Sequence, residues 1–217
     1  MNFFKLKKKY IIFLVVIGVI LILYFGIKAL IKSHKMQKQR AAWKIYKQAE
    51  AKFQEGKANE ALSVCEKAYP DLVDDKLKAE CISLMAECHG KSKRVLLAED
   101  KFKEAVKLAP TDYKLHLRFG RMYLYNAKYR ANVEMANREY VKALEQLNDA
   151  QKFCPLQDIM DRQDILFHQA DVLEKLKIFA EAQNKYKQMV KLGDTYPTKR
   201  SRYYEEAKTR LEELEKE

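Results

Sequence analysis

The stretch AEDKFKEAVKLAPTD, residues 98–112, determines how the rest of the chain is interpreted. On an α-helix, Ala98, Phe102 and Ala105 lie at positions i, i+4 and i+7 and therefore share one face. Pro110 then ends the helix, because proline lacks an amide hydrogen and clashes with the preceding turn. The question is whether this is a single amphipathic helix or one copy of a repeated unit.

The same spacing recurs along the chain. Before Ala98, across a short turn, the stretch AECISLMAECHG (residues 79–90) has its apolar residues on one helical face, with a small residue among them. Three other places repeat this pairing, and successive copies are 37, 45 and 39 residues apart. The leading alanines of the second helices are Ala61, Ala98, Ala143 and Ala182, and the small residues of the helices before them are Ala49, Ala86, Gly120 and Ala170.

This unit resembles the tetratricopeptide repeat (TPR), a helix–turn–helix of 34 residues. Small residues let two helices cross closely, and the chain has few glycines and prolines for β-hairpin turns. The resemblance covers roughly residues 42–217 and implies an all-α fold, with about four TPR-like helix pairs stacked in an α-solenoid. Because the spacings exceed 34 residues, we expect longer loops. An irregular helical bundle is the alternative.

Two segments depart from the simple repeat. Between Tyr125 and Ala143 the third copy holds many more residues than a turn needs, which predicts two lengthened helices that project beyond their neighbours. They form either a partner-specific contact or a hairpin that packs on itself. The last segment, residues 201–217, has an apolar stripe that predicts a helix capping the solenoid. A short coiled coil with another chain is the alternative.

An uninterrupted apolar stretch, YIIFLVVIGVILILYFGI, occupies residues 10–27. As a helix it spans about 27 Å, close to the thickness of a bilayer core. Lys28 can reach the headgroups, which extends the predicted transmembrane helix to residues 10–31. A cleaved signal peptide and a buried globular helix are the alternatives, but no small-residue cleavage site is present. The predicted organisation is a basic tail (1–9), a single-pass transmembrane helix (10–31), a basic juxtamembrane linker (32–41) and a TPR-like repeat domain (42–217).

The net charge of +12 is concentrated around this apolar stretch. Residues 1–49 hold eleven Lys and Arg and no acidic residue, which leaves 31 basic against 30 acidic residues in the rest. We therefore expect membrane-flanking charge and no nucleic-acid binding. Four lysines in the short N-terminal tail favour a cytoplasmic N-terminus. We predict a bacterial inner-membrane protein with a periplasmic C-terminal domain.

No pattern for catalysis is visible. The four histidines are scattered, and the sequence lacks the common hydrolase, metalloprotease and phosphate-loop motifs. We predict no catalytic, cofactor or metal site, no small-molecule substrate and no enzymatic activity. The four cysteines (Cys65, Cys81, Cys88 and Cys154) are expected to be buried thiols, while a pairing of Cys65 with Cys81 or Cys88 stays open in an oxidising compartment.

The resemblance to TPR proteins implies a concave wall, built from the leading helices, that holds an extended peptide or a partner's helix. Some relatives clamp a C-terminal carboxylate with a Lys and an Arg four residues later, as in Lys114 and Arg118, together with asparagines where this chain has Glu50 and Leu84. The candidate protein-binding residues are Tyr46, Phe53, Lys114, Arg118, Arg121, Tyr125, Tyr129 and Phe167.

The leading hypothesis is a non-enzymatic, membrane-anchored TPR scaffold. It binds a partner protein and supports the assembly or bracing of a membrane-associated complex in secretion, motility or cell-envelope machinery. Its partners would be protein and, through the N-terminal helix, the lipid bilayer. The alternatives are a chaperone or receptor that captures client peptides in the TPR groove, and a regulatory subunit of a membrane enzyme.

Overall fold

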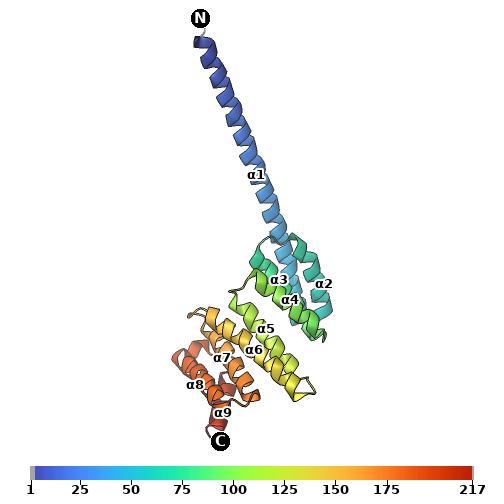
Figure 1. Ribbon diagram of the computed structural model, residues 1–217, viewed down its shortest axis with the longest axis vertical. Coiled ribbons are helices and arrows are strands. Elements are labelled where there is room, and N and C mark those ends of the chain that lie inside the picture. Colours follow the sequence, from blue (N-terminus) through green and yellow to red (C-terminus); the bar gives the residue numbers. More distant parts are fainter. Residues whose placement is uncertain (1–2, 217) are drawn as a thin grey trace.

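The computed structural model describes the backbone of residues 3–216 and the side chains of residues 18–216. Within these residues the chain is all-α and contains no strand (Figure 1). Short 3-10 segments follow α2 (Tyr69–Asp71) and α8 (Pro197–Lys199). The α-helices are α1 (Phe3–Gln54), α2 (Ala58–Ala68), α3 (Asp75–Lys91), α4 (Val95–Leu108), α5 (Tyr113–Ala127), α6 (Val133–Phe153), α7 (Ile159–Lys175), α8 (Phe179–Thr195) and α9 (Tyr204–Leu214).

The helices pack as four consecutive antiparallel pairs, α1–α2, α3–α4, α5–α6 and α7–α8, and the second helix of each pair also contacts the next element. This arrangement confirms the predicted all-α, solenoid-like fold. At each crossing the leading alanine is completely buried, as the sequence pattern predicts. The four residues are Ala61, Ala98, Ala143 and Ala182.

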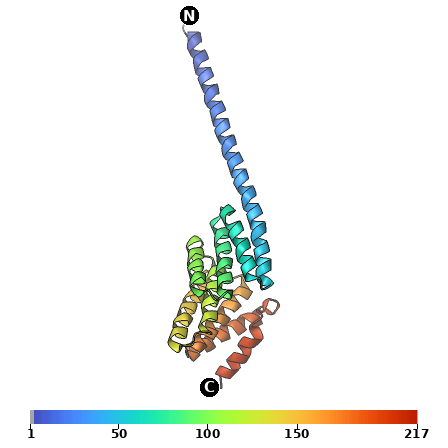
Figure 2. The same cartoon turned by 90° about the vertical axis from the view of Figure 1, so that its right-hand side faces the viewer.

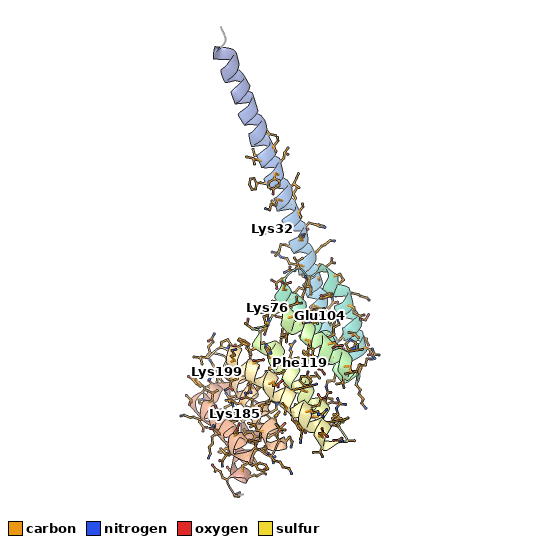
Figure 3. All side chains as sticks on the ribbon, viewed as in Figure 1. Lys32, Lys76, Glu104, Phe119, Lys185 and Lys199 are labelled. Atoms are coloured by element: carbon orange, nitrogen blue, oxygen red, sulfur yellow. The ribbon has the colours of Figure 1, made fainter. Side chains whose placement is uncertain are left out.

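The crossing of α5 and α6 requires a close approach of the two helices. A Cβ atom placed on Gly120 would lie 2.9 Å from Cγ of Leu147 and 3.2 Å from the carbonyl oxygen of Ala143. Phe119, labelled in Figure 3, fills the adjacent space, and its ring stacks on that of Phe102 with 5.0 Å between centroids. The small residue that the sequence pattern places at this crossing therefore lets the two helices pack side by side.

The turns within three of the pairs share a backbone feature. Gly56, Lys93 and Lys177 have positive φ angles of 79°, 59° and 62°, and each precedes its leading alanine by five residues. A left-handed residue is a common way to end a helix and redirect the chain. In the third pair the corresponding position falls inside α6, so the chain turns elsewhere.

The extra residues of the third pair are taken up chiefly by α6. This helix begins at Val133, ten residues before Ala143, whereas α4 begins only three residues before its leading alanine. The prediction of two lengthened helices thus holds for α6, whereas α5 has 15 residues against 17 in α3 and α7. An ion pair of 3.0 Å between Arg130 and Glu139 ties the projecting turn back to α6.

Helix α9 covers the end of the stack, as predicted for a capping helix. Ala207 of α9 is completely buried among the apolar residues of α7 and α8. The fit at its start is tight, because a Cβ atom on Gly193 would overlap the ring of Tyr204. The last pair therefore does not expose its apolar face.

Helix α1 has two different parts. Its C-terminal part is the leading helix of the first pair, with Ala42, Tyr46 and Ala49 buried against α2 and α3. Its N-terminal part projects away from the body (Figures 1 and 2), and Lys32 lies on it (Figure 3). The predicted linker, residues 32–41, is a helical continuation of the same element.

The predicted transmembrane helix falls partly outside the described residues, since the side chains of residues 10–17 are not among them. Across the residues that are described, no helix combines the length and the apolar character needed to cross a membrane.

Candidate protein-binding groove

A hollow of about 560 Å³ lies on the inner side of the stack, where the leading helices α1, α3, α5 and α7 converge with the segment between α8 and α9. We call it the inner hollow. It is lined by Phe53, Gln54, Glu87, Gly90, Lys91, Arg118, Arg121, Met122, Leu124, Tyr125, Lys128, His168 and Arg202.

The inner hollow is strongly basic. Five cationic residues and a single carboxylate, that of Glu87, line it. None of the five cations has an acidic partner within 4.0 Å among residues 18–216, although the same stretch contains many ion pairs elsewhere. Positive charge therefore exceeds negative charge among the residues that line the hollow, although carboxylates outside the lining, such as Asp164 and Asp171, lie near enough to act on Arg121, Lys128 and Arg202. The cations are Lys91, Arg118, Arg121, Lys128 and Arg202.

Burial and neighbouring charges shift the pKa values of two charged groups in the inner hollow. Burial raises the pKa of the Glu87 carboxyl, while nearby arginines oppose that rise. Burial disfavours the charge of Arg118, but the carboxylate of Glu87 and the hydroxyl of Tyr46 more than compensate and raise its pKa. The Arg118 guanidinium donates a hydrogen bond of 2.9 Å to Oγ of Ser83, which fixes its direction at the wall of the inner hollow.

His168 of α7 is an unpaired polar group in this wall. It is 6% exposed, and neither ring nitrogen has a hydrogen-bond partner within the described part of the chain. Burial, assisted by the positive charges of Arg121, Arg202 and Lys128, lowers the pKa of His168 to about 3. The ring is therefore neutral at ordinary pH, with one donor and one acceptor nitrogen, both of them buried beneath the surface of the hollow.

An apolar margin lies beside the cations. Met122 and Leu124 of α5 are buried, whereas Tyr125 is 45% exposed and packs against Tyr129, which is 70% exposed, with 4.9 Å between ring centroids. Nζ of Lys91 lies 6.0 Å from the centroid of the Tyr125 ring. A ligand in the inner hollow would meet aromatic and cationic surfaces together.

The structure brings half of the predicted binding residues together. Phe53, Arg118, Arg121 and Tyr125 line the inner hollow, and Tyr129 extends it through its contact with Tyr125.

The other three predicted residues lie elsewhere. Tyr46 is buried, stacks on Trp43 and donates a 2.9 Å hydrogen bond to Glu50. Lys114 is exposed near the start of α5 with its Nζ over the ring of Tyr113, and it does not line the inner hollow.

Phe167 is covered by the chain itself. Its ring stacks on Tyr203 with 4.4 Å between centroids. The same segment is held by Gln163, which donates a 2.9 Å hydrogen bond to the carbonyl oxygen of Lys199 and accepts a 3.1 Å bond from the amide of Ser201. The inner surface of the fourth pair is thus occupied by residues 199–204.

Three cations and a histidine of the site were not among the predicted binding residues. Lys91 and Lys128 lie at the ends of leading helices. At a helix end, the sequence does not show whether a residue lines the groove or belongs to the turn that follows. His168 was one of several scattered histidines, and Arg202 belongs to no repeat. Only the path of the segment between α8 and α9 places Arg202 at the inner hollow.

No protein-family model matches the sequence, and no curated protein matches it. Among solved structures, PilF of Pseudomonas aeruginosa aligns with a TM-score of 0.60 at 16% identity, over 74% of this chain and 65% of its own. A signal transduction ATPase with numerous domains from Pyrococcus horikoshii, which has a tetratricopeptide repeat sensor, aligns with a TM-score of 0.61 at 18% identity, over 83% of this chain and 27% of its own.

The chain thus spans less than two thirds of the length of either structure. At these identities the likeness concerns the fold alone. Together with the four buried helix crossings, it shows that the chain has a tetratricopeptide-like fold.

Proposed function

We propose that the protein is a non-enzymatic scaffold, anchored in a membrane by residues 10–31, that binds a partner protein in the inner hollow. In this role it supports the assembly or bracing of a membrane-associated complex, such as secretion, motility or cell-envelope machinery. The observation that carries the proposal is that α1 is at once the projecting apolar helix and the leading helix of the first pair.

The anchor is supported by exposed apolar surface. Between Val19 and Ile31, ten large apolar side chains are at least 49% exposed, and they belong to a helix that contacts no other element there. Surface of this kind is stabilised by removal from water, at about 25 cal/mol per Å². A lipid bilayer accounts for both the length and the all-round apolar character of residues 10–27.

The binding role is supported by the inner hollow. It combines unbalanced cations, an unpaired histidine and exposed aromatic rings on a rigid frame of helices. Sites of this size with a few convergent polar groups are typical of ligand binding. Confinement of the protein and its partner to one membrane raises their effective concentration, so a modest affinity suffices.

Photocrosslinking in intact membranes tests this proposal. A photoreactive residue at Arg121 or Tyr129 is expected to capture one partner protein in stoichiometric amount. The same residue at Lys107, an exposed position of α4, serves as the matched control and is expected not to capture it. Capture of only lipid or of a second copy from both groove positions would overturn the scaffold role.

The membrane arrangement is tested separately. Release of the chain by high salt without detergent would contradict the anchor. A cysteine introduced at Lys199, an exposed residue, is expected to react with an impermeant maleimide added outside intact bacterial cells if the repeat domain is periplasmic. The native cysteines are buried and so contribute little to the signal.

A further inference from the structure

Part of the inner surface is already covered by another segment of the same chain, and the contacts made there show how a leading helix holds a segment. The fourth leading helix, α7, presents the acidic residues Asp164 and Glu174. A segment with opposite charge lies across it. Ser201 bonds to Asp164, and the guanidinium of Arg210 pairs with Glu174 at 2.5 Å. The ring of Tyr203 stacks on Phe167, so residues 199–204 cover α7 through hydrogen bonds and stacking, and α9 adds the ion pair.

The inner hollow has the opposite charge and no such cover. Its lining holds five cations and one carboxylate, with Asp164 and Asp171 of α7 nearby, whereas residues 50–217 as a whole are close to neutral. The excess is therefore local to this surface. Arg118 donates one hydrogen bond to Ser83, and none of the five cations forms an ion pair within the described residues.

We infer that the inner hollow binds an acidic peptide segment, with side-chain carboxylates among Arg121, Lys128 and Arg202 and an apolar side chain against Leu124 and Tyr125. This inference rests on the proposed function and specifies the chemistry of the partner. Arg202 comes from outside the repeats, so the complete site exists only when the segment between α8 and α9 is docked on α7.

His168 favours a peptide over a simple anion. A buried donor or acceptor without a partner destabilises the free protein. Both nitrogens of His168 are covered in the free chain, so a ligand supplies their partner by displacing the side chains that cover them. Because the ring is neutral, it has one donor nitrogen and one acceptor nitrogen. A carboxylate can only accept hydrogen bonds, but a peptide also brings backbone N–H groups. An acidic peptide therefore suits both the histidine and the surrounding cations.

The test uses the full chain in uncharged detergent micelles and a fluorescein-labelled peptide, EELDEF, with an amidated C-terminus. Both termini are blocked, so any binding comes from side chains and backbone. The neutral peptide QQLNQF is the matched ligand. We expect EELDEF to bind at least about tenfold more tightly than QQLNQF, with an affinity that falls as salt is added. Equal binding of the two peptides would overturn the inference.

Charge reversal locates the site. Arg121→Glu and Arg202→Glu are expected to weaken binding of EELDEF by about tenfold or more, because each replaces attraction with repulsion. Lys107→Glu changes the net charge equally on the far side of α4 and is expected to leave affinity within about twofold. The inference fails if all three variants bind alike while circular dichroism shows them folded.

A shape-preserving variant tests the histidine. His168→Phe keeps a buried aromatic ring but removes both nitrogens, so we expect weaker binding of EELDEF with an unchanged dependence on salt. Binding equal to that of the unaltered protein would remove His168 from the site.

Two further outcomes separate this inference from the proposed function. If probes at Arg121 capture a partner through a segment without acidic residues, the scaffold role stands and the acidic chemistry fails. If vesicles that contain phosphatidylglycerol bind through Arg121 and EELDEF does not, the hollow serves a lipid headgroup, and the peptide assignment is wrong.

Discussion

The inner surface of the stack is open over its first three pairs and closed over the fourth. In the closed region, residues 199–204 cover α7 through hydrogen bonds to Gln163 and Asp164 and a ring stack on Phe167, and Arg210 of α9 pairs with Glu174. In the open region, the cations of the inner hollow have no such cover. The same helical framework can thus satisfy its inner surface internally or leave it available, and only the available part qualifies as a binding site.

The largest expected effect comes from forcing the closed region open. Gly193→Ala adds a Cβ atom where the ring of Tyr204 lies, so α9 must shift or undock. We expect a loss of about 1–3 kcal/mol in the free energy of unfolding, which is the usual cost of overpacking. Urea denaturation measures the loss, and limited proteolysis should show earlier cleavage within residues 197–216.

Gly90→Ala is the matched control, from the wall of the open region. Its new Cβ would meet Cγ of Met122 at 3.9 Å, an ordinary contact. Since alanine is favoured over glycine within a helix, this variant is expected to gain up to about 1 kcal/mol. Equal destabilisation by the two substitutions would mean that the tight fit of α9 is not what holds the closed region.

A second test removes one charge from the closed region. Arg210→Ala leaves the Glu174 carboxylate, whose side chain is 9% exposed, without its cationic partner and with only the hydrogen bond from the Tyr186 hydroxyl. We expect a cost of about 1–3 kcal/mol in unfolding experiments, because an unpaired buried charge is poorly solvated. Arg138→Ala, which breaks an exposed pair with Glu134, is expected to cost no more than about 0.5 kcal/mol.

A third test uses the pH dependence of stability at the boundary of the two regions. The pKa of His168 is about 3 in the folded protein, against about 6.5 in an unfolded chain. Between pH 6.5 and about 3, the unfolded state therefore binds a proton at His168 that the folded state does not bind. We expect stability to fall with pH from about 6.5 toward 3, by at most about 1.4 kcal/mol per pH unit.

His168→Gln isolates this contribution. Burial raises the pKa values of Glu87, Asp164 and Asp171, whose contributions to stability are lost as pH rises and therefore run in the opposite direction. The quantity to compare is thus the difference in slope between the unaltered protein and the variant. An identical slope would show that His168 is protonated to the same extent in both states.

The smallest expected effect concerns the turns that both regions share. Lys93 precedes α4 beside the open region and Lys177 precedes α8 in the closed one, and both have left-handed backbone conformations. Replacement by glycine removes a steric cost of about 1 kcal/mol, partly offset by the greater freedom of glycine in the unfolded chain. We expect Lys93→Gly and Lys177→Gly each to raise the urea midpoint slightly. A lower midpoint in either variant would contradict the backbone argument.

The sequence predicted the helix pairs well because their information is local. Buried residues such as Ala98 and Phe102 repeat at fixed offsets, and each pair folds mainly against itself and its neighbour. The placement of the extra residues in α6 was less predictable. The pattern of apolar residues does not show whether the helix before a turn or the helix after it is the longer one.

The candidate site was harder to predict because it depends on contacts that are distant in sequence. Phe167 occupies a wall position of its helix, but the ring of Tyr203 covers it. Tyr46 points into the first pair instead of the groove. Arg202 reaches the inner hollow only through the docking of its segment on Gln163, a contact between residues 38 positions apart that no local spacing reveals.

The unbroken course of α1 sets the mechanics of the protein when residues 10–31 are embedded in a bilayer. From Ile31 to Ala42 the helix rises by about 16 Å, with no hinge between the lipid-facing part and the first pair. The repeat stack then cannot swivel like a domain on a flexible tether. It can spin about the helix axis, tilt with the helix and drift in the plane, which confines the inner hollow to a limited range of heights above the bilayer. A partner would have to present its acidic segment within that range of distances from the membrane surface. The rigid α1 would therefore select partners by the position of this segment as well as by its charge.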